Sequence, residues 1–237
     1  MTEEEWQSAT DPAGLLDWLE RGFRCDGRKR RLFVAAACRL AWTGLRPDVQ
    51  RLVEAAEDVA DAPPFARVRL AGSDFYDALL ALRHERLSGL EEEVRGLACW
   101  AFHGVGPAVT VAAAVRGLCP PVTPALLADR VRELFGNPFR PIRRVGALLH
   151  ARVAAWPAHR QPKAVLFVRE WQSWQDGTVV RLARAIHAER AYDRLPILAD
   201  ALEDAGCTDA TILDHCRRPG GHVRGCWLLD VLLDRTQ

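Results

Sequence analysis

The sequence predicts an all-α protein, a multi-helix bundle, with a short α-solenoid of helical hairpins as the alternative. Apolar residues recur at three- and four-residue spacing along most of the 237-residue chain, whereas alternating runs between hairpin turns are scarce. Capping residues and first-turn prolines precede many of these apolar stretches, as they do at helix N-termini. With 49% hydrophobic residues, the chain can bury a sizeable core without disulfides.

Residues 1–62 are expected to form an N-terminal helical subdomain. Its three helices each begin at a cap, a basic turn or a proline, and each stops at a glycine or before a proline pair. Their expected ranges are Pro12 to Gly22, Arg28 to Gly44 and Pro47 to Asp61. We interpret the basic turn from Arg28 to Arg31 as a solvated helix end, although the helix dipole disfavours positive charge there.

Residues 63–135 are expected to form a variable helical middle. Serine, threonine and proline caps predict helices that begin at Ser73, Ser88, Gly106 and Thr123, and the last of these runs to Phe135. The segment before Ser73 could be a short strand or an irregular link.

Residues 136–237 are expected to form a C-terminal helical unit, set apart by the loop from Gly136 to Pro141. Its two prolines within four residues forbid a helix. The stretch from Val165 to Trp174 could be strand or helix. Caps and glycine stops predict helices over Ile142 to about Ala155, Asp176 to Arg190, Asp193 to Ala205, a stretch after Asp209, and His222 to Asp234.

Four motifs of this C-terminal third resemble an uncharacterised family of bacterial proteins from large, paralogue-rich genomes. They read GNPFRP at 136–141, DGTVVRLA at 176–183, RLPILADALEDAGC at 194–207 and GHVRGCW at 221–227. The N-terminal stretch, with Trp6 and the block from Arg28 to Phe33, is similar to the same family. That family has no assigned activity, so the resemblance implies kinship and leaves the chemistry open.

The C-terminal third also holds a cysteine and histidine cluster, in which the weak metal-ligand candidates are Cys207, His215, His222 and Cys226. Zinc sites of the finger type usually show two cysteines two to four residues apart, and the chain has no such pair. Because Leu229 and Leu233 would share a helix face with Cys226, we interpret that thiol as core. A Cys-His nucleophile on the same face would leave no room for substrate. We therefore expect no metal, no cofactor and no catalytic residue.

The link before the last expected helix is a candidate anion site. Its members are Arg217, Arg218, Gly220, Gly221 and Arg224, because guanidinium groups and a helix N-terminus could converge on one ligand. The alternative is an ordinary glycine turn whose arginines are solvated or pair with Asp209 and Asp214.

Two of the eight tryptophans, Trp171 and Trp174, lie among polar residues and are candidates for a partner surface. The others lie among apolar neighbours, which is typical of core packing.

The net charge and the absence of known motifs limit the classes of function to be expected. A formal net charge of +1 makes nucleic acid an improbable partner, although Arg217, Arg218, Arg224 and the basic turn leave a weak phosphate or nucleic-acid binder as one alternative. The acidic start and the lack of a long apolar stretch predict a cytoplasmic protein with no membrane partner. The chain lacks a Walker loop, a dinucleotide fingerprint, Gly-x-Ser-x-Gly and His-Glu-x-x-His. We therefore expect a non-enzymatic module that interacts with another protein, with a metal-binding or enzymatic role for the Cys/His cluster as the other alternative.

Overall fold

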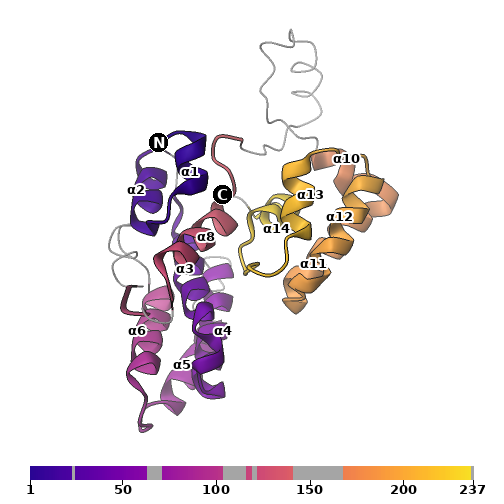
Figure 1. The fold of residues 1–237 in the computed structure, drawn as a ribbon. Coiled ribbons are helices and arrows are strands. Elements are labelled where there is room, and N and C mark those ends of the chain that lie inside the picture. Colours follow the sequence, from indigo (N-terminus) through magenta and orange to yellow (C-terminus); the bar gives the residue numbers. More distant parts are fainter. Residues whose placement is uncertain (23–24, 63–70, 104–115, 119–121, 141–167, 236–237) are drawn as a thin grey trace. The chain divides into compact units, whose positions relative to one another are not determined.

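The computed structural model describes residues 1–22, 25–62, 71–103, 116–118, 122–140 and 168–235. Every regular element in these ranges is a helix, which confirms the all-α prediction (Figure 1). Two compact units result, Met1–Leu134 and Phe135–Gln237. Among the described residues, no helix combines the length and the apolar character that a membrane span requires. The expected helix over Ile142 to about Ala155 and most of the one from Gly106 lie outside the described residues.

The N-terminal unit is a set of helices whose main contacts are α3 with α4, α3 with α6, α4 with α5 and α4 with α6. Their bounds are α1 Glu3–Ser8, α2 Pro12–Gly22, α3 Gly27–Leu40, α4 Pro47–Asp61, α5 Ala71–Ala81, α6 Gly89–His103 and α8 Pro124–Phe135. Short 3-10 turns occur at Trp42–Gly44 and Arg116–Leu118.

Helix α1 is an element that the sequence analysis missed. Thr2 and Glu5 form a capping box, in which the Thr2 hydroxyl accepts the Glu5 N–H at 3.2 Å and the Glu5 carboxylate accepts the Thr2 N–H at 2.7 Å. Trp6, fully buried, anchors this short helix in the unit.

The basic turn at the start of α3 is not a solvated helix end, so that interpretation was wrong. Arg28 pairs with Asp61 at 2.6 Å, and the ammonium group of Lys29, which is 7% exposed, donates to the Leu134 carbonyl at 2.7 Å. Arg30 pairs with Glu20 at 2.7 Å, and Arg31 donates to the Phe102 carbonyl at 3.1 Å. These cations hold neighbouring helices of the N-terminal unit together.

The C-terminal unit packs α11 against α10, α12 and α14, and α12 against α13. Its helices are α10 Val168–Ser173, α11 Thr178–Glu189, α12 Leu195–Asp204, α13 Ala210–Arg217 and α14 Trp227–Leu232, with 3-10 turns at Trp174–Gly177 and Tyr192–Arg194. Residues 168–173 are therefore helix and not strand.

The last helix is shorter than the sequence predicted. It begins at Trp227 and not at His222, because Gly220, Gly221 and Gly225 all adopt left-handed backbone conformations, with φ of 70°, 81° and 86°. A right-handed helix cannot run through such residues. Residues 219–226 therefore form a loop between α13 and α14.

Candidate functional site

The polar side chains that are best suited to bind a metal ion meet at this loop of the C-terminal unit. His215 comes from α13, His222 from the loop and Cys226 from the N-cap of α14. One ligand atom from each of the three residues lies within 4.8 Å of the others. The geometry thus joins three of the four weak metal candidates that the sequence offered.

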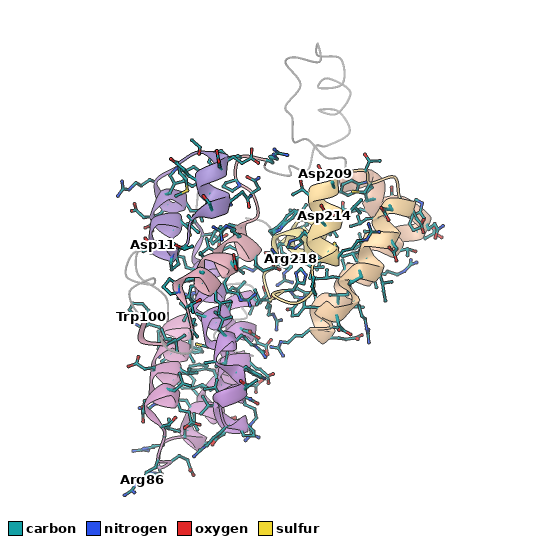
Figure 2. All side chains as sticks on the ribbon, viewed as in Figure 1. Asp11, Arg86, Trp100, Asp209, Asp214 and Arg218 are labelled. Carbon is teal, nitrogen blue, oxygen red and sulfur yellow. The ribbon has the colours of Figure 1, made fainter. Side chains whose placement is uncertain are left out.

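Helix α13 fixes the position of His215. The Asp209 side chain caps this helix by accepting the N–H groups of Thr211 at 2.9 Å and Ile212 at 3.2 Å. Figure 2 shows Asp209 and Asp214 on this part of the chain and Arg218 directly after it. Since Ile212 and Cys216 are fully buried, His215 lies on the inward side of α13 and is 9% exposed.

The glycine-rich loop returns the chain toward His215. The Cys226 N–H donates to the Val223 carbonyl at 3.0 Å, and the Cys226 carbonyl accepts the first intrahelical bond of α14 from Asp230, also at 3.0 Å. As a result, the Cys226 side chain is fully buried, and its Sγ lies 3.1 Å from Nε2 of His215.

His222 is oriented by the loop itself. Its Nε2 lies 3.2 Å from the Arg218 carbonyl oxygen, and its ring stands nearly perpendicular to the His215 ring, with centroids 5.0 Å apart. A carbonyl oxygen can only accept, so Nε2 of His222 carries the hydrogen and Nδ1 of the neutral ring is unprotonated. An unprotonated ring nitrogen is the form that binds metal, and metal-binding histidines usually donate their other N–H to a carbonyl or carboxylate.

Trp227 completes the cluster. Its indole Nε1–H donates to Nδ1 of His215 at 3.3 Å, and the centroids of the two rings are 4.8 Å apart. This residue was not among the candidates from the sequence, because nothing in a one-dimensional pattern shows which histidine nitrogen an indole reaches.

Cys207, the fourth metal candidate, does not join this group. It is 3% exposed and packs in the apolar core of the C-terminal unit. Burial raises the pKa of its thiol above the ordinary value. Cys207 is not among the residues whose ligand atoms come together around His215.

The structure lacks one part of the predicted anion site, the helix N-terminus, and it pairs Arg217 with other residues. No helix begins at Gly220 or Gly221, which removes the N-terminus that the site required. Arg217 instead pairs with Asp200 at 3.0 Å and with Glu203, both on α12. The sequence indicated Asp209 and Asp214 as possible partners; in the structure Asp200 and Glu203 form the ion pairs with Arg217 instead.

Of the two tryptophans proposed for a partner surface, Trp171 lies in the core and Trp174 is partly buried against it. Trp171 is 5% exposed, and Trp174 packs against the same apolar cluster. The cause is the backbone around them, because Gln175, Asp176 and Gly177 adopt left-handed conformations that turn the chain sharply at this point. The polar neighbours of Trp171 in the sequence gave no indication of its burial.

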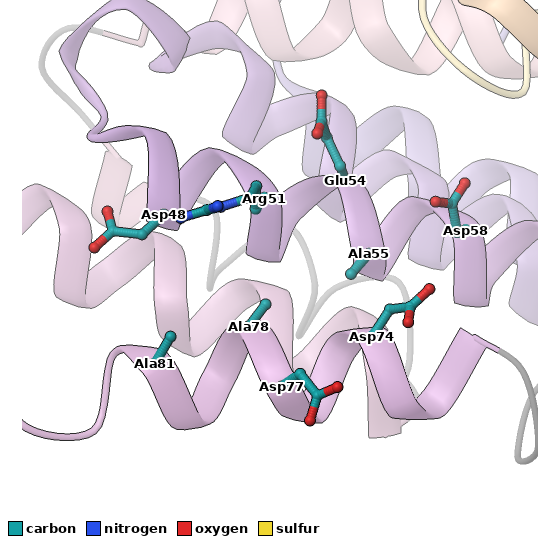
Figure 3. Close-up of a pocket in the computed structure, with 9 residues that line it drawn as sticks. All are labelled: Asp48, Arg51, Glu54, Ala55, Asp58, Asp74, Asp77, Ala78 and Ala81. Carbon is teal, nitrogen blue, oxygen red and sulfur yellow. The ribbon is translucent and has the colours of Figure 1, made fainter.

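A separate pocket lies between α4 and α5 of the N-terminal unit, with a volume of about 470 Å³. Three alanines, five carboxylates and one guanidinium line it (Figure 3): Asp48, Arg51, Glu54, Ala55, Asp58, Asp74, Asp77, Ala78 and Ala81. Asp48 pairs with Arg46, which lowers the pKa of the aspartate through a side-chain hydrogen bond. The Asp74 and Asp77 side chains on α5 are exposed to solvent.

Comparisons with protein-family models, with curated proteins and with solved structures gave no match.

Proposed function

We propose that the C-terminal unit binds a transition-metal ion, Zn²⁺ in the first place, through His215, His222 and Cys226. The observation that carries the proposal is the approach of three ligand atoms to within 4.8 Å of one another. Imidazole nitrogens with one thiolate are typical zinc ligands. This proposal departs from the expectation, drawn from the sequence, that the protein holds no metal.

Three features support zinc at this place. A tetrahedral zinc ion with Zn–N near 2.05 Å and Zn–S near 2.3 Å separates the two ligand atoms by about 3.6 Å. Nε2 of His215 and Sγ of Cys226 are 3.1 Å apart, so admitting the ion requires them to part by roughly half an ångström. The unprotonated Nδ1 of His222 follows from its bond to the Arg218 carbonyl. Finally, left-handed glycines at 220, 221 and 225 let the loop adjust around the ion.

Three protein ligands from this unit leave one coordination position of a tetrahedral ion for water or another donor. Closed structural zinc sites use four protein ligands, while sites that exchange a ligand keep one position open. We therefore propose a zinc centre that can accept an additional donor, and not a finger-type structural site.

The test is metal uptake by the full-length protein after chelation and removal of metal. We expect one zinc ion per chain by elemental analysis, and with Co²⁺ the visible bands of a tetrahedral site together with a thiolate charge-transfer band. His222→Ala should weaken binding by at least about 100-fold, because a lost ligand costs more than the 10–100-fold of a lost outer partner. Cys207→Ala is the matched control and should bind like the unaltered protein.

Thermal unfolding gives an independent measure. A ligand present at 100 times its dissociation constant stabilises the folded state by about 2.7 kcal/mol. Zinc should therefore raise the melting temperature of the unaltered protein and of Cys207→Ala but not that of His222→Ala. No zinc uptake, or equal uptake by all three proteins, would refute the proposal.

A second candidate function is the interaction module that the sequence favours. The observation that supports it is the α4–α5 pocket, whose lining carries one guanidinium and five carboxylates, of which Asp48 pairs with Arg46 and Glu54 with Arg39. Charge complementarity makes a basic segment of another protein the expected occupant. An arginine-rich helical peptide should bind in calorimetry, more weakly at high salt, and not to the Asp74→Asn, Asp77→Asn double variant. Equal binding to the double variant would refute this assignment.

A further inference from the structure

The proton on His215 can be placed from its two neighbours. The indole nitrogen of Trp227 can only donate, so Nδ1 of His215 is the acceptor in the 3.3 Å bond between them. A neutral imidazole carries one hydrogen, which must then be on Nε2. Nε2–H therefore donates to Sγ of Cys226 across the 3.1 Å separation.

This tautomer has a consequence for metal binding. An ion next to Cys226 is coordinated by the ring nitrogen that faces the thiol, which is Nε2, and coordination requires that nitrogen to be unprotonated. The neutral ring loses the Nε2 proton to water and takes a proton from water at Nδ1, so its own proton count is unchanged. Once Nδ1 carries a hydrogen, it cannot accept one from the indole.

We infer that Trp227 is a positioning residue that holds His215 in the tautomer unable to bind metal, so that metal binding must break the Trp227–His215 hydrogen bond. The inference rests on the proposed zinc site and specifies how that site is regulated. His222 is different, because its own hydrogen bond to Arg218 already leaves its Nδ1 unprotonated. The two histidines would thus bind one ion through opposite ring nitrogens.

Packing around Trp227 keeps the indole in this role. A side-chain carbon added at Gly136, which belongs to the same unit, would lie 3.0 Å from Cγ and 3.1 Å from Cδ2 of the indole. The backbone at Gly136 therefore lies close to the ring, which also lies beside the His215 imidazole. Since the ring is confined at these contacts, releasing His215 requires a local shift of the indole.

The first test reads the tautomers directly. Long-range proton–nitrogen NMR spectra of the imidazole rings distinguish the two neutral tautomers, and we expect His215 to change from the Nε2–H to the Nδ1–H form when zinc is added. His222 is an internal control and should keep its Nε2–H form in both states. The indole N–H signal of Trp227 should shift on zinc addition.

The second test removes only the donor. Trp227→Phe keeps an aromatic ring beside His215 but has no N–H, so it should bind zinc about two- to tenfold more tightly than the unaltered protein, the range expected for one net hydrogen bond. Trp174→Phe, which alters an indole packed elsewhere against the same core, should leave the dissociation constant unchanged.

The outcomes separate this inference from the proposed function. If the unaltered protein takes up no zinc, the metal site itself is refuted. If zinc binds but His215 keeps its Nε2–H form, or Trp227→Phe binds no more tightly than the unaltered protein, the zinc site stands and the role of Trp227 is refuted. Circular dichroism checks that the Phe variant is folded, and if it is not, the tautomer measurement on the unaltered protein decides.

Discussion

Replacing Gly136 with alanine should destabilise the C-terminal unit through two effects that the structure separates. Gly136 has a φ of 68°, a left-handed conformation that costs an alanine about 1–2 kcal/mol. The added methyl carbon would also lie 3.0 Å from the indole of Trp227, and overpacking of this kind typically costs about 1–3 kcal/mol. The expected loss is therefore about 2–5 kcal/mol in the free energy of unfolding.

Gly206→Ala is the matched control for the backbone effect. Gly206 also has a left-handed conformation, with a φ of 89°, but a carbon added there meets no atom within 4 Å. It should lose only the backbone contribution, about 1–2 kcal/mol. The difference between the two variants thus reports the contact between residue 136 and Trp227.

Thermal unfolding and hydrogen exchange of the full-length protein measure both variants. For a unit of about this size, each kcal/mol lowers the melting temperature by about 4–8 °C, so Gly136→Ala should lose at least about 8 °C. Amides of α13 and α14 should exchange faster in Gly136→Ala than in Gly206→Ala, because the clash acts on Trp227 at the start of α14. Equal losses in the two variants would show that the indole gives way without cost.

Three further predictions concern the N-terminal unit. The Ser88 backbone N–H, the Ser88 hydroxyl and the Arg46 backbone N–H lower the pKa of Glu91 despite its burial. Glu91 therefore contributes stability above the ordinary carboxyl pKa that disappears as pH falls through the lowered value, and urea unfolding of Glu91→Gln should show a flatter acid dependence. Burial raises the pKa of the Cys38 thiol to about 12, so iodoacetamide should label Cys38 only after denaturation; labelling of the native protein would contradict this. Asp61→Asn breaks the buried pair with Arg28 and should cost about 3–5 kcal/mol in urea unfolding, and a cost below about 1 kcal/mol would show that the pair behaves like an exposed one.

The sequence located helices best where chemistry marks both ends. Pro47 and Asp61 bound α4 as predicted, and Thr123 caps α8 by accepting the Leu126 N–H at 3.3 Å, also as predicted. The predicted start of the last helix was wrong, because the apolar pattern continues N-terminal to Trp227 and such a pattern carries no information on the backbone angle φ. Only the left-handed conformation at Gly225, which the structure revealed, shows that the chain is still turning there.

The candidate site was predictable in its members but not in its geometry. His215, His222 and Cys226 were recognised as possible ligands, yet Cys226 was interpreted as part of a leucine-lined helix face because the helix was expected to begin earlier. With α14 starting after it, Cys226 becomes an N-cap residue next to His215. Trp227 could not have been found, since its role depends on a tertiary contact with one particular ring nitrogen.

The buried ammonium of Lys29 has a practical consequence for anyone labelling this protein. The chain has two lysines among its 32 basic residues, Lys29 and Lys163, and the first donates to the Leu134 carbonyl from a position that is 7% exposed. Amine-reactive dyes, cross-linkers and surface-coupling reagents would therefore find few targets on the folded protein, and distance restraints are better sought with carboxylate-directed cross-linkers. Conversely, a dye that couples to Lys29 would signal that the end of α8 has separated from α3, which makes this lysine a sensitive reporter of unfolding in the N-terminal unit.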